Sequence, residues 1–132
     1  FWPILVPNTF GNEEIFTEWI KVFKPDGFIL SGGNDLNEYL LRDNTEKFIL
    51  NYASKNKKPL LGICKGMQMM SVWDGASLVK IKNHVKTYHK TNKTNFPKLI
   101  NSFHDFGVID CPKNFNILLK AEDGVIEAIA HK

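Results

Sequence analysis

The stretch Pro59-Leu-Leu-Gly-Ile-Cys-Lys-Gly-Met-Gln-Met-Met70 places one cysteine between two glycines, where an apolar strand must turn into a helix. Residues 60–63 are typical of the end of a buried parallel strand, and Gly62 and Gly66 lack side chains that would clash in a tight turn. This pattern predicts a nucleophile elbow that presents Cys64 in a cleft. The N-terminus of the following helix favours the thiolate, which is the nucleophilic form of cysteine.

A second apolar strand also ends in small residues, within Asp26-Gly-Phe-Ile-Leu-Ser-Gly-Gly-Asn-Asp35. Its Gly32-Gly33 pair allows backbone amides to approach a ligand closely. An N–H from this turn, together with the N–H of Lys65 after the cysteine, can bind a developing oxyanion. The two segments together favour a nucleophile over the alternative that Cys64 is a small core residue.

Five segments of the sequence occur in the order of a known family, and they are Ile29-Leu-Ser-Gly-Gly-Asn-Asp35, Arg42-Asp43 with Glu46, Pro59 to Gln68, Asn101-Ser-Phe-His104 and Ile126-Glu-Ala-Ile129. With these segments the chain resembles the class I glutamine amidotransferases, and within them the γ-glutamyl hydrolase branch typified by γ-glutamyl-γ-aminobutyrate hydrolase. The resemblance covers most of the chain. It implies an α/β fold of the flavodoxin-like type, with an open parallel sheet flanked by helices, and one domain over residues 1–132.

The resemblance also implies a reaction, which is hydrolysis of a γ-glutamyl amide bond. Cys64 would attack the amide carbon and form a γ-glutamyl thioester, while the amides of Gly33 and Lys65 bind the oxyanion. Water would then release glutamate, without a metal or an organic cofactor. The residues implied to bind or line the substrate site are Gln68, Ser102, Phe103 and His104. Where the family commonly has Arg after the nucleophile, Lys65 keeps the charge but loses the bidentate fork, so a carboxylate partner is expected to be held less tightly.

The general base of the family is a His-x-Glu pair beyond the Ile-Glu-Ala-Ile segment, and no such pair follows Cys64 in this sequence. The first residues, Phe1-Trp-Pro-Ile-Leu-Val-Pro7, have the character of an interior strand. The chain is therefore expected to be incomplete at both termini. Two alternatives to a free-standing hydrolase stay open, namely a glutaminase subunit that delivers ammonia to a partner synthase and a non-catalytic binding module that lacks the base.

The remaining histidines and lysines are further candidates for functional residues. His84 and His89 lie in a polar, Lys-rich stretch that is expected to be a solvated loop, and His131 is expected in a loop. Because no histidine has metal-ligand spacing with the cysteines, the sequence predicts no metal site. The basic segment over residues 80–98 either forms a solvated surface or attracts an anionic substrate. Nucleic-acid binding is not favoured, since no recognition-helix pattern accompanies the lysines.

Composition sets the remaining expectations. The net charge is +3 and hydrophobic residues make up 43% of the chain, which is enough for a packed core. No apolar run approaches the roughly 20 residues of a membrane span, and no signal peptide is apparent, so a cytoplasmic protein without a membrane partner is expected. Cys64 and Cys111 are expected to be free thiols in a reducing compartment. The oligomeric state and the leaving amine of the substrate are left open.

Hydrophobic periodicity predicts alternating strands and helices followed by a β-rich half. Helices are expected at residues 12–23, 45–56 and 65–73. Strands are expected at residues 4–6, 28–30, 60–63, 78–81, 98–102, 116–120 and 125–130. The Arg42-Asp43 pair is interpreted as the start of the second helix, capped by Asp43 or Asn44, with a substrate-facing Arg42 as the alternative.

Overall fold

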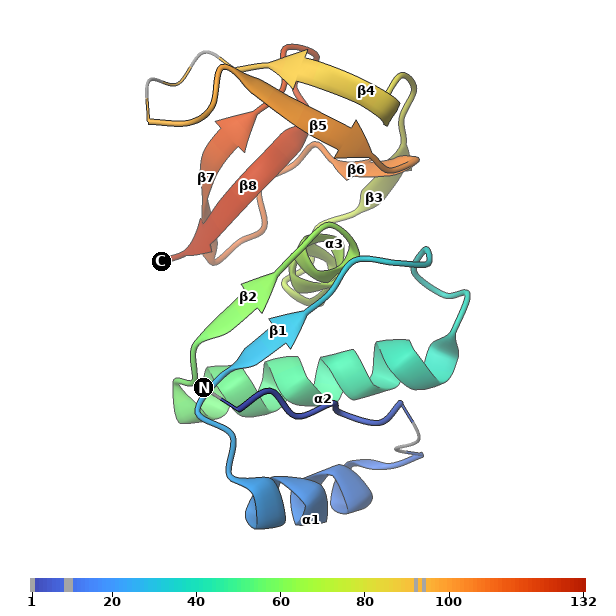
Figure 1. The fold of residues 1–132 in the computed structure, drawn as a ribbon, viewed down its shortest axis with the longest axis vertical. Helices are drawn as coiled ribbons and strands as arrows, with labels where there is room; N and C mark the ends of the chain where they lie inside the picture. The colour runs from blue at the N-terminus through green and yellow to red at the C-terminus, as the bar shows by residue number, and fades with distance from the viewer. Residues whose placement is uncertain (1, 9–10, 92, 94) are drawn as a thin grey trace. The chain divides into compact units, whose positions relative to one another are not determined.

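The computed structural model describes residues 2–8, 11–91, 93 and 95–132, and it divides into two compact units (Figure 1). The first unit is Phe1–Met69 and the second is Met70–Lys132. The first unit alternates helices with strands, as predicted, in the order α1 (Glu13–Phe23), β1 (Phe28–Leu30), α2 (Leu40–Asn56), β2 (Leu60–Gly62) and the beginning of α3 (Lys65–Trp73). In the part of the chain that the structure describes, no helix is both long and apolar enough to span a membrane.

Local signals explain the bounds of α1. The side chain of Asn12 accepts a hydrogen bond of 3.0 Å from the N–H of Ile15, which is the N-cap arrangement. Lys24 ends the helix in the left-handed conformation, and its N–H donates to the carbonyl of Ile20. The buried face carries Phe16 and Ile20. The predicted helix over residues 12–23 is thus confirmed.

The core of the first unit is an aromatic cluster beneath β1. The ring of Phe16 lies 6.0 Å from Phe48 and 6.4 Å from Tyr52, and Tyr52 lies 6.0 Å from Phe28. These edge and stacked contacts come from α1, α2 and β1, so they fix the two helices against the strand that leads to the Gly32-Gly33 turn.

β1 and β2 pair in parallel, with Phe28 opposite Leu60. The prediction that residues 60–63 are buried is wrong, because Leu61 is 55% exposed and Ile63 is 51% exposed, while Leu60 and Gly62 are only half-buried. The reason is the period of two along a strand, since only one face of this two-stranded sheet is covered within the unit. Ile29 of β1 has the same outward orientation and is 69% exposed.

Two further predictions for the first unit are corrected. Residues 4–6 do not form a strand, because they have no pairing partner in the described structure. Helix α2 begins at Leu40 instead of residue 45, so neither Asp43 nor Asn44 caps it. The carboxylate of Asp43 is buried and accepts the backbone N–H of Asn37 at 2.6 Å. This tertiary use of the side chain overrides the local capping preference.

The second unit is β-rich, as predicted, and its strands are β3 (Leu78–Lys80), β4 (Val85–Lys90), β5 (Leu99–Phe103), β6 (Phe106–Val108), β7 (Phe115–Lys120) and β8 (Ile126–His131). One sheet has the order β3-β6-β8-β7 and a separate hairpin pairs β4 with β5, all antiparallel (Figure 1). The apolar core of this unit includes Val108, Phe115, Leu119 and Ile126.

The strands β4 and β6 were not predicted. Residues 83–90 were expected to form a solvated loop, which is wrong for β4 and for His84, whose side chain is buried. The pairing places Thr87 opposite Ser102 and His89 opposite Ile100, with a register shift where Lys86 takes a left-handed conformation. The lysines of this hairpin are exposed, while the ring of His84 is buried. The Lys-rich composition therefore did not predict the buried position of His84.

Candidate active site

The elbow around Cys64 has the predicted strand, turn and helix arrangement. β2 ends at Gly62, α3 begins at Lys65, and Cys64 between them has a φ of 52°. Positive φ is costly for a residue with a side chain, so it requires support from its surroundings. The N–H of Ile63 donates to the carbonyl of Leu30 at 2.9 Å on one side of the turn, and the N–H of Gln68 donates to the carbonyl of Cys64 at 3.1 Å on the other. Cys64 itself is exposed.

Two glycines allow close packing of the elbow against the end of β1. A Cβ atom at Gly66 would lie only 2.2 Å from the carbonyl oxygen of Leu30, so a side chain is excluded there. A Cβ atom at Gly32 would lie 3.3 Å from the Cβ and 3.8 Å from the Sγ of Cys64. The Gly32-Gly33 turn and the cysteine are therefore neighbours in space, as the sequence predicts.

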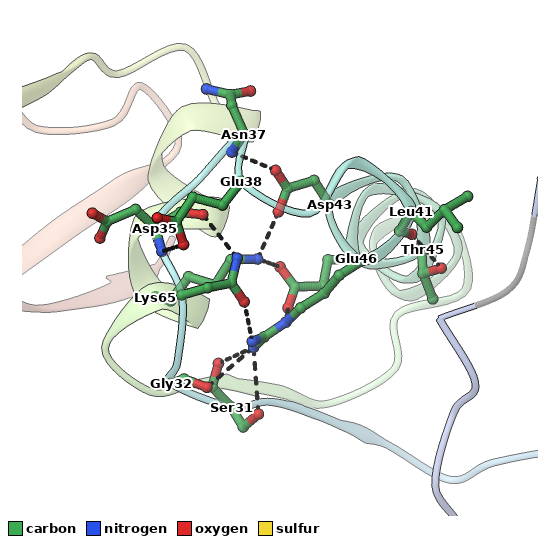
Figure 2. A network of polar contacts seen from close by, with 12 residues as sticks. Ser31, Gly32, Asp35, Asn37, Glu38, Leu41, Asp43, Thr45, Glu46 and Lys65 are labelled. Carbon is green, nitrogen blue, oxygen red and sulfur yellow. Dashed lines mark hydrogen bonds and ion pairs between the residues drawn. The ribbon is translucent and has the colours of Figure 1, made fainter.

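The side chain of Lys65 is buried within an ionic network (Figure 2). Its Nζ lies 2.7 Å from Oδ1 of Asp43 and 2.5 Å from Oε2 of Glu46. The other oxygen of Glu46 accepts a hydrogen bond of 2.8 Å from Nε of Arg42. Lys65 was expected to hold a carboxylate less tightly than arginine would, and the structure shows that it contacts two carboxylates of α2.

Arg42 extends this network to the loop after β1. Its guanidinium donates to the carbonyl of Ser31 at 2.7 Å, to the carbonyl of Gly32 at 3.2 Å and to Oδ1 of Asn34 at 2.8 Å. These bonds direct the guanidinium to the loop, and the alternative that Arg42 faces the substrate stays a prediction. One helix, α2, thus anchors both the Gly32-Gly33 turn and the elbow (Figure 2).

The predicted oxyanion donors are the backbone amides of Gly33 and Lys65. Within the described residues, neither amide makes a hydrogen bond to another backbone group. Gly33 has a φ of 142°, which a residue with a side chain rarely adopts. The assignment of both amides as oxyanion donors stays a prediction. Gln68, which is predicted to hold the glutamyl group, is buried on α3.

The other predicted site residues belong to the second unit. Ser102 is buried, and its hydroxyl donates to the carbonyl of His84 at 2.8 Å. Phe103 is 63% exposed. His104 donates from Nδ1 to the carbonyl of Phe106 at 2.8 Å. The carboxylate of Glu127, 3.8 Å from Nε2, raises the pKa of the His104 imidazole against the opposing effect of burial. The roles assigned to these three residues stay predictions.

A cluster of histidines in the second unit was missed by sequence reasoning. The ring of His84 stacks on that of His89 with centroids 3.9 Å apart and lies 5.0 Å from that of His104. Glu127 of β8 lies beside the rings, 3.4 Å from His84. Spacing relative to the cysteines could not reveal this cluster, because its side chains converge only through the pairing of strands.

Comparison with known proteins identifies the family. The family model for "Glutamine amidotransferase class-I" matches residues 3–132. The chain belongs to the class I glutamine amidotransferases. The chain is 36% identical over 110 residues to the Gamma-glutamyl-CDP-amidate hydrolase of Campylobacter jejuni, in a match that covers 79% of the chain and 54% of that protein. It is 29% identical over 138 residues to a subunit of the glutamine-hydrolyzing GMP synthase of Thermococcus kodakarensis, covering 97% of the chain and 68% of that relative.

Solved structures confirm the fold class of the chain. A protein from Thermoplasma acidophilum that is described as a candidate subunit of GMP synthase has a TM-score of 0.73 at 24% identity, over 98% of the chain and 65% of that protein. A glutamine amidotransferase from Thermotoga maritima has a TM-score of 0.63 at 21% identity, over 78% of the chain and 51% of that protein. The predicted α/β fold of the class I amidotransferase type is therefore confirmed.

Proposed function

We propose that this chain contains the nucleophile and the oxyanion site of a γ-glutamyl amide hydrolase. The observation that supports this most directly is the strained, exposed Cys64 beside Gly32, between β2 and α3. A strained strand-to-helix turn is the geometry that presents a nucleophile to a substrate. The likeness to the Campylobacter hydrolase supports the same reaction, although the chain spans about half of that protein.

In the proposed reaction, the thiolate of Cys64 attacks the γ-carbonyl carbon of the substrate. The N–H groups of Gly33 and Lys65 stabilise the negative charge on the carbonyl oxygen. The amine leaves with a proton and a γ-glutamyl thioester remains on the sulfur, and water then hydrolyses the thioester to glutamate and regenerates the thiol. The general base for both steps is assigned to a His-x-Glu pair of the kind that the family uses.

The proposal is tested by following glutamate release from γ-glutamyl amides by the full-length protein. Changing Cys64→Ala is expected to abolish release, while Cys111→Ala, which removes the other exposed cysteine, leaves the rate unchanged. Mass spectrometry after rapid acid quenching is expected to find the γ-glutamyl group on the peptide that contains Cys64. Glutamate release that survives Cys64→Ala would contradict the assignment of the nucleophile.

The leaving amine is proposed to carry an anionic group. Two observations favour this choice, namely the name of the Campylobacter relative, which describes a nucleotide-linked amide, and the run of lysines without acidic residues over residues 80–98. A phosphate-bearing γ-glutamyl amide is expected to be hydrolysed with a kcat/KM that falls as salt increases, because screening weakens steering. Equal kcat/KM for neutral and phosphorylated amides at low salt would contradict this choice.

A second candidate function is that of a glutaminase subunit, which delivers ammonia to a synthase. The likeness to the GMP synthase subunit of Thermococcus kodakarensis favours it. A protein of this kind is expected to hydrolyse glutamine slowly by itself and faster with its synthase partner. A high rate on a γ-glutamyl amide by the isolated protein would instead favour the free-standing hydrolase. If Cys64→Ala retains the cellular role, a binding module without catalysis is the better description.

A further inference from the structure

The histidine cluster of the second unit brings together candidate metal ligands from different strands. His84 immediately precedes β4, His89 lies within β4, and Glu127 lies in β8. One ligand atom from each residue lies within 4.8 Å of the other two. His84 is buried and the side chain of Glu127 is only 11% exposed. Three possible ligand atoms therefore lie close together in this unit.

Two atoms of this cluster are buried without a hydrogen-bond partner in the described structure. They are Nε2 of His89 and Oε1 of Glu127. Native proteins satisfy nearly all buried polar atoms, and an unsatisfied one costs about 1–3 kcal/mol, more when it belongs to a charged group. A cation between the two atoms would satisfy both at once.

The hydrogen bonds of His84 leave its Nδ1 facing acceptors. Nε2 lies 2.7 Å from Oδ2 of Asp123, which fixes the proton on Nε2 because a carboxylate only accepts. Nδ1 lies 3.1 Å from Oγ of Ser102 and 3.4 Å from Oε1 of Glu127. The hydroxyl proton of Ser102 is used by the carbonyl of His84, so the serine presents lone pairs to Nδ1. Nδ1 therefore requires either a second proton on the ring or a bound cation.

One ligand separation matches the coordination of zinc, and the stacked rings of His84 and His89 must turn apart for both nitrogens to face one ion. Zinc ligands at about 2.1 Å in a tetrahedral arrangement are about 3.4 Å from one another. Nδ1 of His84 and Oε1 of Glu127 are 3.4 Å apart. The contact of Asp123 with the far nitrogen of His84 also corresponds to the carboxylate–histidine–metal pattern that orients metal ligands.

We propose that His84, His89 and Glu127 form a site for a divalent transition metal of the zinc class, with Asp123 orienting His84. Water completes the tetrahedron, and the second oxygen of Glu127 keeps its contact of 3.8 Å with His104. The metal links the β4–β5 hairpin to the β3-β6-β8-β7 sheet within the second unit. Its role is therefore to stabilise that unit, since a metal that binds only the folded form adds its binding free energy to stability.

The test uses the full-length protein with both cysteines changed to serine, so that the exposed thiols of Cys64 and Cys111 do not bind metal. After treatment with EDTA, the protein is titrated with Zn²⁺ in competition with a chromophoric chelator, and Co²⁺ is added separately to record the absorption bands of tetrahedral coordination. One equivalent of zinc and a rise in the melting temperature are expected. Absence of stoichiometric binding would overturn the proposal.

The variants separate this site from adventitious binding. His89→Gln removes a ligand, and Asp123→Asn removes only the orienting carboxylate, which is expected to weaken binding about 10–100-fold. Glu122→Gln is the matched control, because it removes a neighbouring exposed charge and leaves the cluster intact. If circular dichroism shows that His89→Gln does not fold, the zinc affinity of Asp123→Asn is the test. That variant is expected to fold, since the side chain of Asp123 is 48% exposed. Equal zinc affinity of Asp123→Asn and Glu122→Gln would refute the proposal.

Discussion

Replacing Lys65 with methionine is expected to destabilise the protein strongly. Methionine has a similar length but no charge, so the buried carboxylates of Asp43 and Glu46 lose the cation that lies 2.7 and 2.5 Å from them. Asp43 keeps the N–H of Asn37 and Glu46 keeps Arg42, but the pair is left with excess negative charge in the interior. Removing one partner of a buried ion pair costs about 3–5 kcal/mol in unfolding free energy.

The assay is urea unfolding of the purified protein, followed by circular dichroism. With a slope of about 2 kcal/mol per molar urea, a loss of about 4 kcal/mol lowers the midpoint by about 2 M. Lys21→Met is the matched control, because it breaks an ion pair with Glu18 whose side chains are 64% and 70% exposed, and such pairs contribute about 0.2–1 kcal/mol. Lys65→Arg is expected to retain most of the stability, because it keeps the charge.

A double variant tests the electrostatic cause. Adding Glu46→Gln to Lys65→Met removes one of the two orphaned charges, so it is expected to recover part of the loss instead of adding to it. Additive destabilisation would show that packing of the lysine stem, and not charge, carries the effect. A midpoint for Lys65→Met that matches Lys21→Met would refute the reasoning altogether.

Three further substitutions probe the elbow and the core. Gly66→Ala places a Cβ about 2.2 Å from the carbonyl of Leu30 and is expected to cost about 3 kcal/mol or more in unfolding free energy, whereas Gly11→Ala, with nothing within 4 Å, changes it by less than about 0.5 kcal/mol. Phe16→Ala empties the centre of the aromatic cluster and is expected to cost about 3–5 kcal/mol in the same urea assay. Arg42→Met releases the loop after β1 and is expected to lower kcat of the proposed hydrolysis up to about 100-fold, measured by glutamate release, because catalytic groups lose their positions.

Elements whose ends are set by local chemistry were predictable from the sequence. The Asn12 cap fixes the start of α1, and the glycines around Cys64 fix the turn from β2 to α3. β4 was missed because its lysines give it the composition of a loop, while its stability comes from pairing with β5 and from the burial of His84. The convergence of distant histidines with Glu127 leaves no local signal, since it depends on which strands become neighbours.

The wrong prediction for the start of α2 and the ionic network both arise from the buried contacts of Asp43. Asp43 is an excellent capping residue by local rules, so the sequence places a helix start there. In the structure Asp43 is already within the helix, and its carboxylate is directed at Lys65 beside the nucleophile. A residue that gives up a favourable local role for a buried tertiary contact indicates a site under a different constraint. Here that constraint is the alignment of two loops, since α2 also holds the Gly32-Gly33 turn through Arg42. The failure of the local rule therefore points to the same elbow that the glycine pattern predicts.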